Sequence, residues 1–287
     1  MMEFIKSFLG IAVELTILFI VISFVISLLQ GYIPYEKIEK KLTGSNKFIA
    51  SLVAIVFAFI TPFCSCSTIP VVVNMIKNKI PFSIVMVFLF ASPVLDPTIL
   101  TIMSVVMGWK VAVLYTIITS IFSIVIGFTL AKLGFERHVK NVMMTGYEQT
   151  NQKFNWRHAA NETLGLMKSV YPYLLIGALI GAAIHGLVPT HFIAEWFGHD
   201  NWWLIPVAAI IGIPLYIRLS SMIPISQILI AKGMALGPVM ALMISSAGAS
   251  LPEVILLKSI FRKQLVIAFI LSVVSMSTIS GFIFYLL

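Results

Sequence analysis

The two cysteines of the chain, Cys64 and Cys66, lie two positions apart in a proline-flanked stretch. This stretch reads Thr-Pro-Phe-Cys-Ser-Cys-Ser-Thr-Ile-Pro from Thr61 to Pro70. In extended backbone, side chains at positions i and i+2 point to the same face, and the prolines favour that conformation over a helix. Both sulfurs could therefore converge on one soft ion, because thiolates are the preferred ligands of soft metals and metalloids.

Two thiols are too few for a structural zinc site, which uses four ligands. They suit a metalloid that keeps one permanent substituent, or an ion that must be released again. Ser65 and Ser67 alternate with the thiols and join them as candidate substrate-binding residues. The alternative interpretation is that Cys64 and Cys66 are small buried hydrophobic side chains.

Two carboxylates lie beside prolines in otherwise apolar segments. Asp96 precedes Pro97, and Glu253 follows Pro252. A carboxylate at membrane depth is costly, so each is a candidate for proton coupling or for ligand binding. The alternative is that each caps the short helix that begins at its proline. One residue could serve both purposes.

Arg218 is a cation within an apolar segment of the second half of the chain, with Ser220 and Ser221 close behind it. In the internal repeat described below, Arg218 occupies the position of Cys64, and Ser220 that of Cys66. One half then presents thiols and the other a guanidinium. Arg218 could bind an anion, hold Asp96 or Glu253 ionised, or form a purely structural ion pair with one of them.

Composition indicates an integral membrane protein. The chain has 287 residues, of which 60% are hydrophobic and 10% charged, and its mean hydropathy is +1.05. The net charge of +8 comes from basic residues scattered over short loops. That distribution is typical of cytoplasmic loops and does not indicate nucleic-acid binding. We expect a multi-pass protein of the inner (plasma) membrane.

Apolar segments predict helices along most of the chain. We expect all-α structure with long apolar segments over residues 8–29, 48–63, 81–109, 111–130, 171–187, 202–213, 238–257 and 265–287, and a short helix over 68–76. Serines, prolines and glycine predict breaks at 91–97 and 245–253, and Pro214 predicts a break after residue 213.

The pattern of the first half recurs in the second. Residues 221–224, Ser-Met-Ile-Pro, lie over residues 67–70, Ser-Thr-Ile-Pro, 154 positions later. We interpret the chain as a single permease domain, 1–287, with pseudo-symmetric halves at 1–135 and 155–287 joined by a cytoplasmic loop at 136–154. Broken or re-entrant helices would meet at the midplane. An inverted arrangement of the halves places most basic residues on one face, whereas eight full crossings divide them almost evenly, so the positive-inside rule favours inversion.

Duplication with paired broken segments is typical of secondary transporters, whose sites lie at the midplane. The chain has no phosphate-binding Gly-x4-Gly-Lys loop, no His-Glu-x-x-His and no Cys-x-x-Cys, so we expect neither an enzyme nor a cofactor. A membrane-embedded thiol enzyme stays open as an alternative.

Residues 62–70, the Ser-Pro and Asp-Pro break and the cysteine-free second half together resemble the ArsP/YraQ-type predicted permeases, over essentially the full length. The resemblance implies an inner-membrane permease of about eight segments. The best-understood members of that family export trivalent organoarsenicals such as methylarsenite, with cysteines of this motif implicated. Carried over, that role falls on Cys64 and Cys66.

We therefore expect export of a small soft substrate, with a trivalent organoarsenical as the leading candidate. A permease for a small anion or a sulfur compound, centred on Arg218, is the alternative. The expected partners are a small-molecule substrate and the lipid bilayer, not nucleic acid, and association with further copies of the chain stays open.

Overall fold

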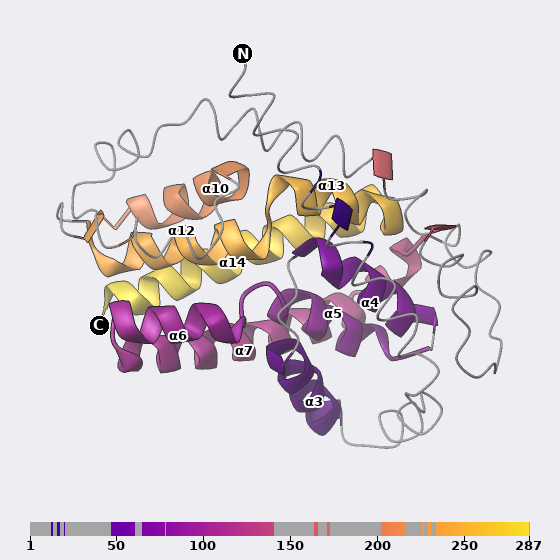
Figure 1. Ribbon diagram of the computed structural model, residues 1–287, viewed down its shortest axis with the longest axis horizontal. Coiled ribbons are helices and arrows are strands. Elements are labelled where there is room, and N and C mark those ends of the chain that lie inside the picture. The colour runs from indigo at the N-terminus through magenta and orange to yellow at the C-terminus, as the bar shows by residue number, and fades with distance from the viewer. Residues whose placement is uncertain are drawn as a thin grey trace, which may run out of the picture.

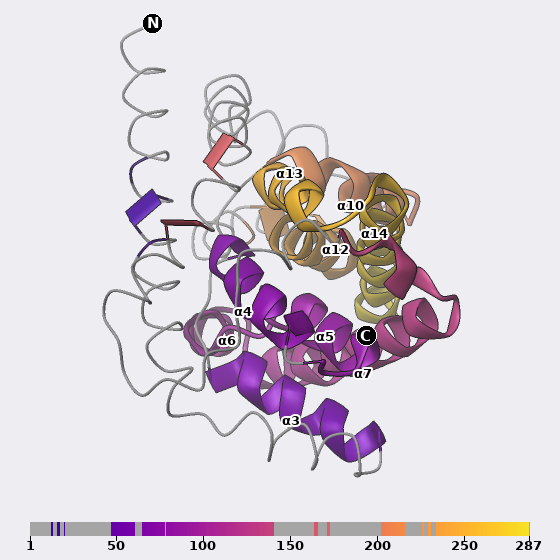
Figure 2. The same cartoon turned by 90° about the vertical axis from the view of Figure 1, so that its right-hand side faces the viewer.

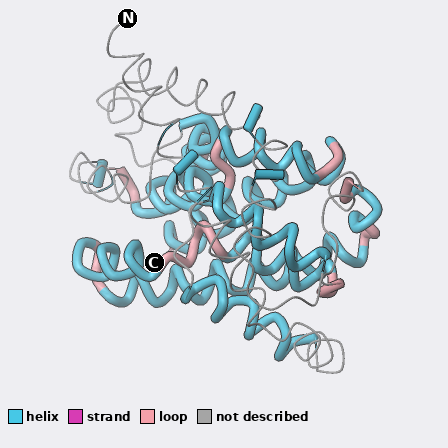
Figure 3. Tube along the Cα trace, turned by 45° about the vertical axis from the view of Figure 1, so that its right-hand side comes forward, coloured by secondary structure: helices cyan, strands magenta, loops and turns pink. Residues whose placement is uncertain are grey.

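The described part of the chain is helical. The computed structural model describes residues 47–60, 65–77, 79–140, 202–215 and 234–286, together with residues 13, 16, 17, 20, 164, 165, 171, 172, 226, 229 and 230. Figure 3 shows this part of the chain as helices joined by loops. Within these residues, the only extended pairing is one isolated antiparallel bridge between Val139 and Phe261. The expectation of an all-α protein is confirmed for the part described.

Ten named elements make up the described structure. They are α3 (Lys47–Ile60), α4 (Ser65–Lys77), α5 (Phe82–Ala91), α6 (Pro97–Val106), α7 (Trp109–Lys132), the 3-10 helix η1 (Phe135–His138), α10 (Leu204–Leu215), α12 (Leu236–Gly248), α13 (Leu251–Ile260) and α14 (Lys263–Tyr285).

Helices α7 and α14 are each long and apolar enough to cross a membrane, and the bent pair α12 and α13 supplies a third candidate span. At 1.5 Å per residue, the 24 residues of α7 extend about 36 Å. Hydroxyl groups within these spans return to their own helix: Ser277 donates to the carbonyl of Val273 at 2.7 Å. Such bonds satisfy a polar side chain inside an apolar span. The long apolar helices expected over 111–130 and 265–287 are confirmed, and both qualify as spans by length and composition.

Both expected breaks are present. Helix α5 ends at Ala91 and α6 begins at Pro97, whereas α12 ends at Gly248 and α13 begins at Leu251. Proline is well tolerated at the first position of a helix, because its missing N–H would have had no partner there. The helices on either side of each break are short, at 10 to 13 residues.

The helices form two groups that pack against each other. Helices α3 to α7 lie on one side, and α10 to α14 lie on the other (Figures 1 and 2). In the first group α3 packs on α5, and α5 and α6 pack on α7; in the second, α10 packs on α12, and α12 and α13 pack on α14. Helices α7 and α14 contact each other across the two groups.

Helices α7 and α14 run antiparallel. One buried cluster joins Leu130, near the end of α7, to Leu265, near the start of α14. A second cluster joins Ala112, near the start of α7, to Phe284, near the end of α14. The candidate span α7 of the first group and the candidate span α14 of the second therefore cross the core in opposite directions.

Close helix approaches depend on glycine. A Cβ atom added to Gly127 of α7 would lie 2.7 Å from Cγ2 of Val87 on α5. One added to Gly281 of α14 would lie 2.9 Å from Cβ of Ala241 on α12. Small residues let helix backbones approach closely in a membrane, where van der Waals packing drives association.

Two helix ends differ from the expectation. Helix α4 begins at Ser65, three residues earlier than expected, so Cys66 lies in its first turn and the prediction of extended backbone at Cys66 is wrong. Serine favours helix starts, and a proline such as Pro70, in the second turn, removes only one backbone hydrogen bond. A break was expected after residue 213, but helix α10 includes Pro214 and ends one residue later, at Leu215.

Candidate functional site

The start of the cysteine-bearing helix α4 is tied to the first break. The hydroxyl oxygens of Thr68 and Ser92 lie 3.1 Å apart, within hydrogen-bond distance. Both residues are fully buried. Thr68 lies two positions after Cys66 in α4, and Ser92 is the first residue after α5. This hydroxyl pair therefore joins the cysteine helix to the turn that leads to Asp96.

Tyr115 of α7 holds the same turn from the other side. Its hydroxyl group donates a hydrogen bond to the carbonyl oxygen of Val94 at 3.1 Å, and the side chain has no exposed surface. Tyr115 was not among the site residues predicted from the sequence. The available signal was a tyrosine within an apolar span, because a buried tyrosine hydroxyl usually finds a hydrogen-bond partner.

The two breaks meet near the middle of α14. A Cβ atom added to Gly248, the last residue of α12, would lie 3.6 Å from Cγ2 of Val94 and 3.2 Å from Cγ1 of Val273. Val273 is ten residues into the 23-residue α14, so this contact lies about 15 Å along the span. A hydrocarbon core is about 30 Å thick, so the contact lies about half-way along a span of that length.

Glu253 lies in the first turn of α13 and has no exposed surface. The hydroxyl oxygen of Ser250 caps this helix by accepting from the backbone N–H of Glu253 at 3.4 Å. Ser-Leu-Pro-Glu has the spacing of a capping box, a signal that the sequence analysis overlooked. A carboxylate in a first helical turn also interacts favourably with the positive end of the helix dipole. The position of Glu253 in the first turn therefore supports a capping role, and the burial of its side chain supports a role in proton coupling or ligand binding.

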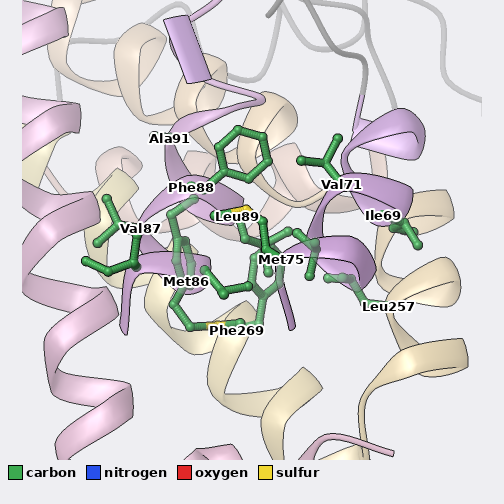
Figure 4. Close-up of a cluster of buried hydrophobic side chains, with 14 of the residues drawn as sticks. Ile69, Val71, Met75, Met86, Val87, Phe88, Leu89, Ala91, Leu257 and Phe269 are labelled. Atoms are coloured by element: carbon green, nitrogen blue, oxygen red, sulfur yellow. The ribbon is translucent and has the colours of Figure 1, made fainter. Parts of the chain in front are cut away.

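Helix α13, which carries Glu253, packs against the cysteine-bearing helix α4. Ile69 of α4 and Leu257 of α13 belong to one buried cluster, in which Phe269 of α14 also lies (Figure 4). The two helices that carry Cys66 and Glu253 in their first turns therefore meet in the core.

Asp96 is placed differently from Glu253. It is partly exposed and directly precedes Pro97, and its carbonyl oxygen accepts from the backbone N–H of Leu100 at 3.0 Å. This is the backbone geometry of a residue that opens a helix. The expected start of a helix at Pro97 is confirmed. The role of the Asp96 carboxylate stays a prediction.

Several predicted site residues lie outside the described residues. They are Cys64, Arg218, Ser220 and Ser221, whereas Ser65, Cys66 and Ser67 are described as part of the α4 backbone. Among the described residues, the structure brings together the start of α4, the turn before Asp96 and the helix that carries Glu253. In this same part of the chain, no three His, Cys, Asp or Glu residues gather to form a metal site.

Comparisons with known proteins give one consistent result. The family model ArsP_1, described as a predicted permease, matches residues 1–286. A UPF0718 protein of Methanocaldococcus jannaschii is 22% identical, over 98% of this chain and 97% of its own length. The UPF0718 protein YraQ of Escherichia coli is 25% identical, over 82% of this chain and 67% of its own. A Streptococcus mutans protein called a putative two-component membrane permease complex subunit is 22% identical, over 85% and 79%. No solved structure matches the chain.

Proposed function

We propose, because this chain belongs to the ArsP_1 family of predicted permeases, that it is a secondary permease that exports a small soft substrate. A trivalent organoarsenical is the leading candidate. The observation that carries the proposal is the meeting of Val94 and Gly248 about half-way along the candidate span α14, with Thr68 of the cysteine helix bonded beside it. Irregular backbone at membrane depth is tolerated where protein surrounds it or where it lines a cavity, and transporter sites lie at such breaks.

The proposed substrate site uses Cys64 and Cys66 as ligands, with Ser65 and Ser67 beside them. Methylarsenite keeps its carbon substituent and offers two positions to thiols. Each As–S bond that forms replaces an As–OH bond, and the thiol proton leaves with the hydroxide as water. Binding therefore needs no oxidant or reductant, and water reverses it on release. Cys66 lies in the first turn of α4 and Cys64 precedes the helix, so the pair would straddle the helix start.

The proposal includes two inverted halves, 1–135 and 155–287, joined by the loop 136–154. Helix starts recur 154 residues apart: Phe82 and Leu236, Pro97 and Leu251, Trp109 and Lys263. The glycine contacts recur with the same spacing, since Gly127 meets Val87 and Gly281 meets Ala241. The corresponding spans α7 and α14 run antiparallel, which supports inversion. Such an arrangement belongs to a multi-pass protein of the inner (plasma) membrane.

The second half would complete the site. In the proposal Arg218, Ser220 and Ser221 face the thiols from the break that corresponds to the cysteine stretch. Asp96 and Glu253 would couple export to protons. Of these two carboxylates, Glu253 has the stronger support, because it is fully buried and lies on the helix that packs against α4.

The test is transport of methylarsenite into everted membrane vesicles by the parent and by the double variant Cys64→Ser/Cys66→Ser. We expect the variant to insert and fold but to lose transport. The control adds Ser120→Cys on α7 to the double variant, which restores a thiol away from the breaks and should not restore transport. Unchanged transport by the double variant would remove the thiol site from the proposal.

A second arm separates the thiol site from the anion alternative. Methylarsenite should protect Cys64 and Cys66 from a thiol reagent, whereas inorganic phosphate should not. If methylarsenite transport instead survived loss of both cysteines and failed in Arg218→Gln, the site would be centred on Arg218, and the alternative of a permease for a small anion or a sulfur compound would replace the thiol site.

The proposal of a second protein component depends on the name of one relative. The Streptococcus mutans relative is called a subunit of a two-component complex. We therefore propose that this permease also works beside a second component. Parent transport rates by the purified chain in liposomes would argue against that requirement.

A further inference from the structure

Six basic residues gather where the chain leaves α7 and where it enters α14. They are Lys132, Arg137, Lys140, Lys258, Arg262 and Lys263, and they are called the junction surface here. They come from α7, from the segment that follows it, from α13 and from α14. Five of the six are exposed, and Lys140 is partly buried.

Backbone hydrogen bonds build the junction surface. The N–H of Lys140 donates to the carbonyl of Ile260 at 2.9 Å, and the N–H of Arg262 donates to the carbonyl of His138 at 2.8 Å. These bonds flank the bridge between Val139 and Phe261. The segment after α7 is therefore fastened to the turn between α13 and α14, and basic residues 118 to 131 positions apart in the sequence share one surface.

A further bond fastens the same segment. The ammonium group of Lys140 donates to the carbonyl oxygen of Lys258, close to the end of α13. Lys140 therefore serves as a structural tie, and the other five cations of the junction surface extend toward solvent.

Helix stability accounts for only some of these charges. Lys132 and Lys258 lie in the last turns of α7 and α13, where a cation interacts favourably with the helix dipole, whereas Arg262 and Lys263 lie at the start of α14. Helix α14 has no acidic residue in its first turn; Arg262 is its N-cap residue and Lys263 its first residue. Cations at a helix N-terminus oppose the helix dipole, so both residues disfavour the helix that they open. An external anion would offset that cost.

The junction surface lies at the edge of an apolar surface. Leu133, next to Lys132, is 67% exposed, and Ile267, one turn after Lys263, is 56% exposed. Both candidate spans α7 and α14 have an end here. Apolar side chains that face lipid within one turn of exposed cations place those cations at the level of the lipid headgroups.

We propose that the junction surface binds the phosphate groups of anionic phospholipids in the adjacent leaflet, which the charge distribution predicts to be the cytoplasmic one. Basic residues beside membrane spans attract anionic lipids electrostatically. The geometry favours a lipid over a soluble phosphate, because the neighbouring apolar side chains contact the acyl chains that a phospholipid carries. This binding is independent of which substrate the permease moves.

The test measures binding of dioleoylphosphatidylglycerol to the purified full-length protein in a neutral detergent by native mass spectrometry. The variant is Arg137→Gln/Lys263→Gln, which leaves the tie through Lys140 intact. The matched control, Lys47→Gln/Lys110→Gln, removes two exposed charges elsewhere. We expect the junction variant to bind about 25-fold more weakly, at about fivefold per charge, and the control to bind as the parent does.

Two further measurements sharpen the outcome. The charge-conserving variant Arg137→Lys/Lys263→Arg should bind phosphatidylglycerol as the parent does, which separates lost charge from lost folding. Dioleoylphosphatidylcholine should bind equally to all variants.

Equal weakening of phosphatidylglycerol binding by the junction and control variants would overturn the proposal. Displacement of the lipid by millimolar inorganic phosphate would assign the surface to a free anion, and unchanged lipid binding with loss of a co-purifying acidic protein would assign it to a protein partner.

Discussion

The hydroxyl pair of Thr68 and Ser92 should hold α4 against the first break. Thr68→Val keeps the shape of the side chain but removes its hydroxyl, and Ser92→Ala does the same for the partner. Because both residues are fully buried, water cannot replace the missing partner. Each single variant should therefore lower the free energy of unfolding, and the second change should cost less once the first has been made.

The size of the coupling follows from the geometry. The oxygens lie 3.1 Å apart, slightly more than the about 2.5–3.0 Å that is usual for a hydrogen bond between hydroxyl groups. Hydrogen bonds between side chains in membrane proteins contribute about 0.6 kcal/mol on average and up to about 1.7 kcal/mol. The absence of exposed surface strengthens this bond and its length weakens it, which together favour the middle of that range. We expect a coupling energy of about 1 kcal/mol, or about fivefold in the folding equilibrium.

Reversible unfolding in mixed micelles with a denaturing detergent would measure all four members of the cycle. The control cycle pairs Ser92→Ala with Thr119→Val. Thr119 is equally buried, but its hydroxyl donates to the carbonyl of Tyr115 within its own helix. That cycle should be additive within about 0.3–0.5 kcal/mol. A Thr68–Ser92 coupling no larger than the control would refute the hydrogen bond between α4 and the break.

Three further predictions test the packing and the site. Gly281→Ala should destabilise the protein by about 1–3 kcal/mol in the same unfolding assay, because its Cβ would lie 2.5 Å from Cγ2 of Ile205; parent stability would argue against this close contact. Tyr115→Phe should cost up to about 1.7 kcal/mol through loss of its bond to the carbonyl of Val94, and no change in stability would mean that this bond contributes nothing. Glu253→Gln should keep the protein folded but reduce transport driven by an imposed pH gradient by at least about tenfold; undiminished gradient-driven transport would exclude Glu253 from coupling.

Local features of the chain were predictable from composition. The spans α7 and α14 follow from long apolar segments, because a backbone in lipid must satisfy its hydrogen bonds within its own helix. The breaks before Pro97 and after Gly248 follow from residues that interrupt a helix locally. The start of α4 was predicted too late, because the prolines around Cys66 outweighed the preference of Ser65 for a helix start.

The candidate site could be predicted only in part. Sequence alone identified Asp96 and Glu253, because an ionisable residue in an apolar segment stands out without any structure. The sequence did not show which of the two carboxylates is buried, because burial is a property of the packed helices. Glu253 is fully buried, whereas Asp96 is partly exposed. The thiols and Arg218 stay predictions from their residue types and spacing.

By itself, the sequence determined which segments are apolar enough to cross a membrane, where the described ones break and which residue types lie at those breaks. Only the tertiary structure decided that Thr68 bonds Ser92, that Val94 meets Gly248 and that residues 138–140 pair with 260–262. The physical reason is that helix formation in lipid depends on neighbours within a few residues. Contacts between helices depend on close packing with partners as far as 154 residues away, as for Val94 and Gly248, and no local pattern specifies those partners.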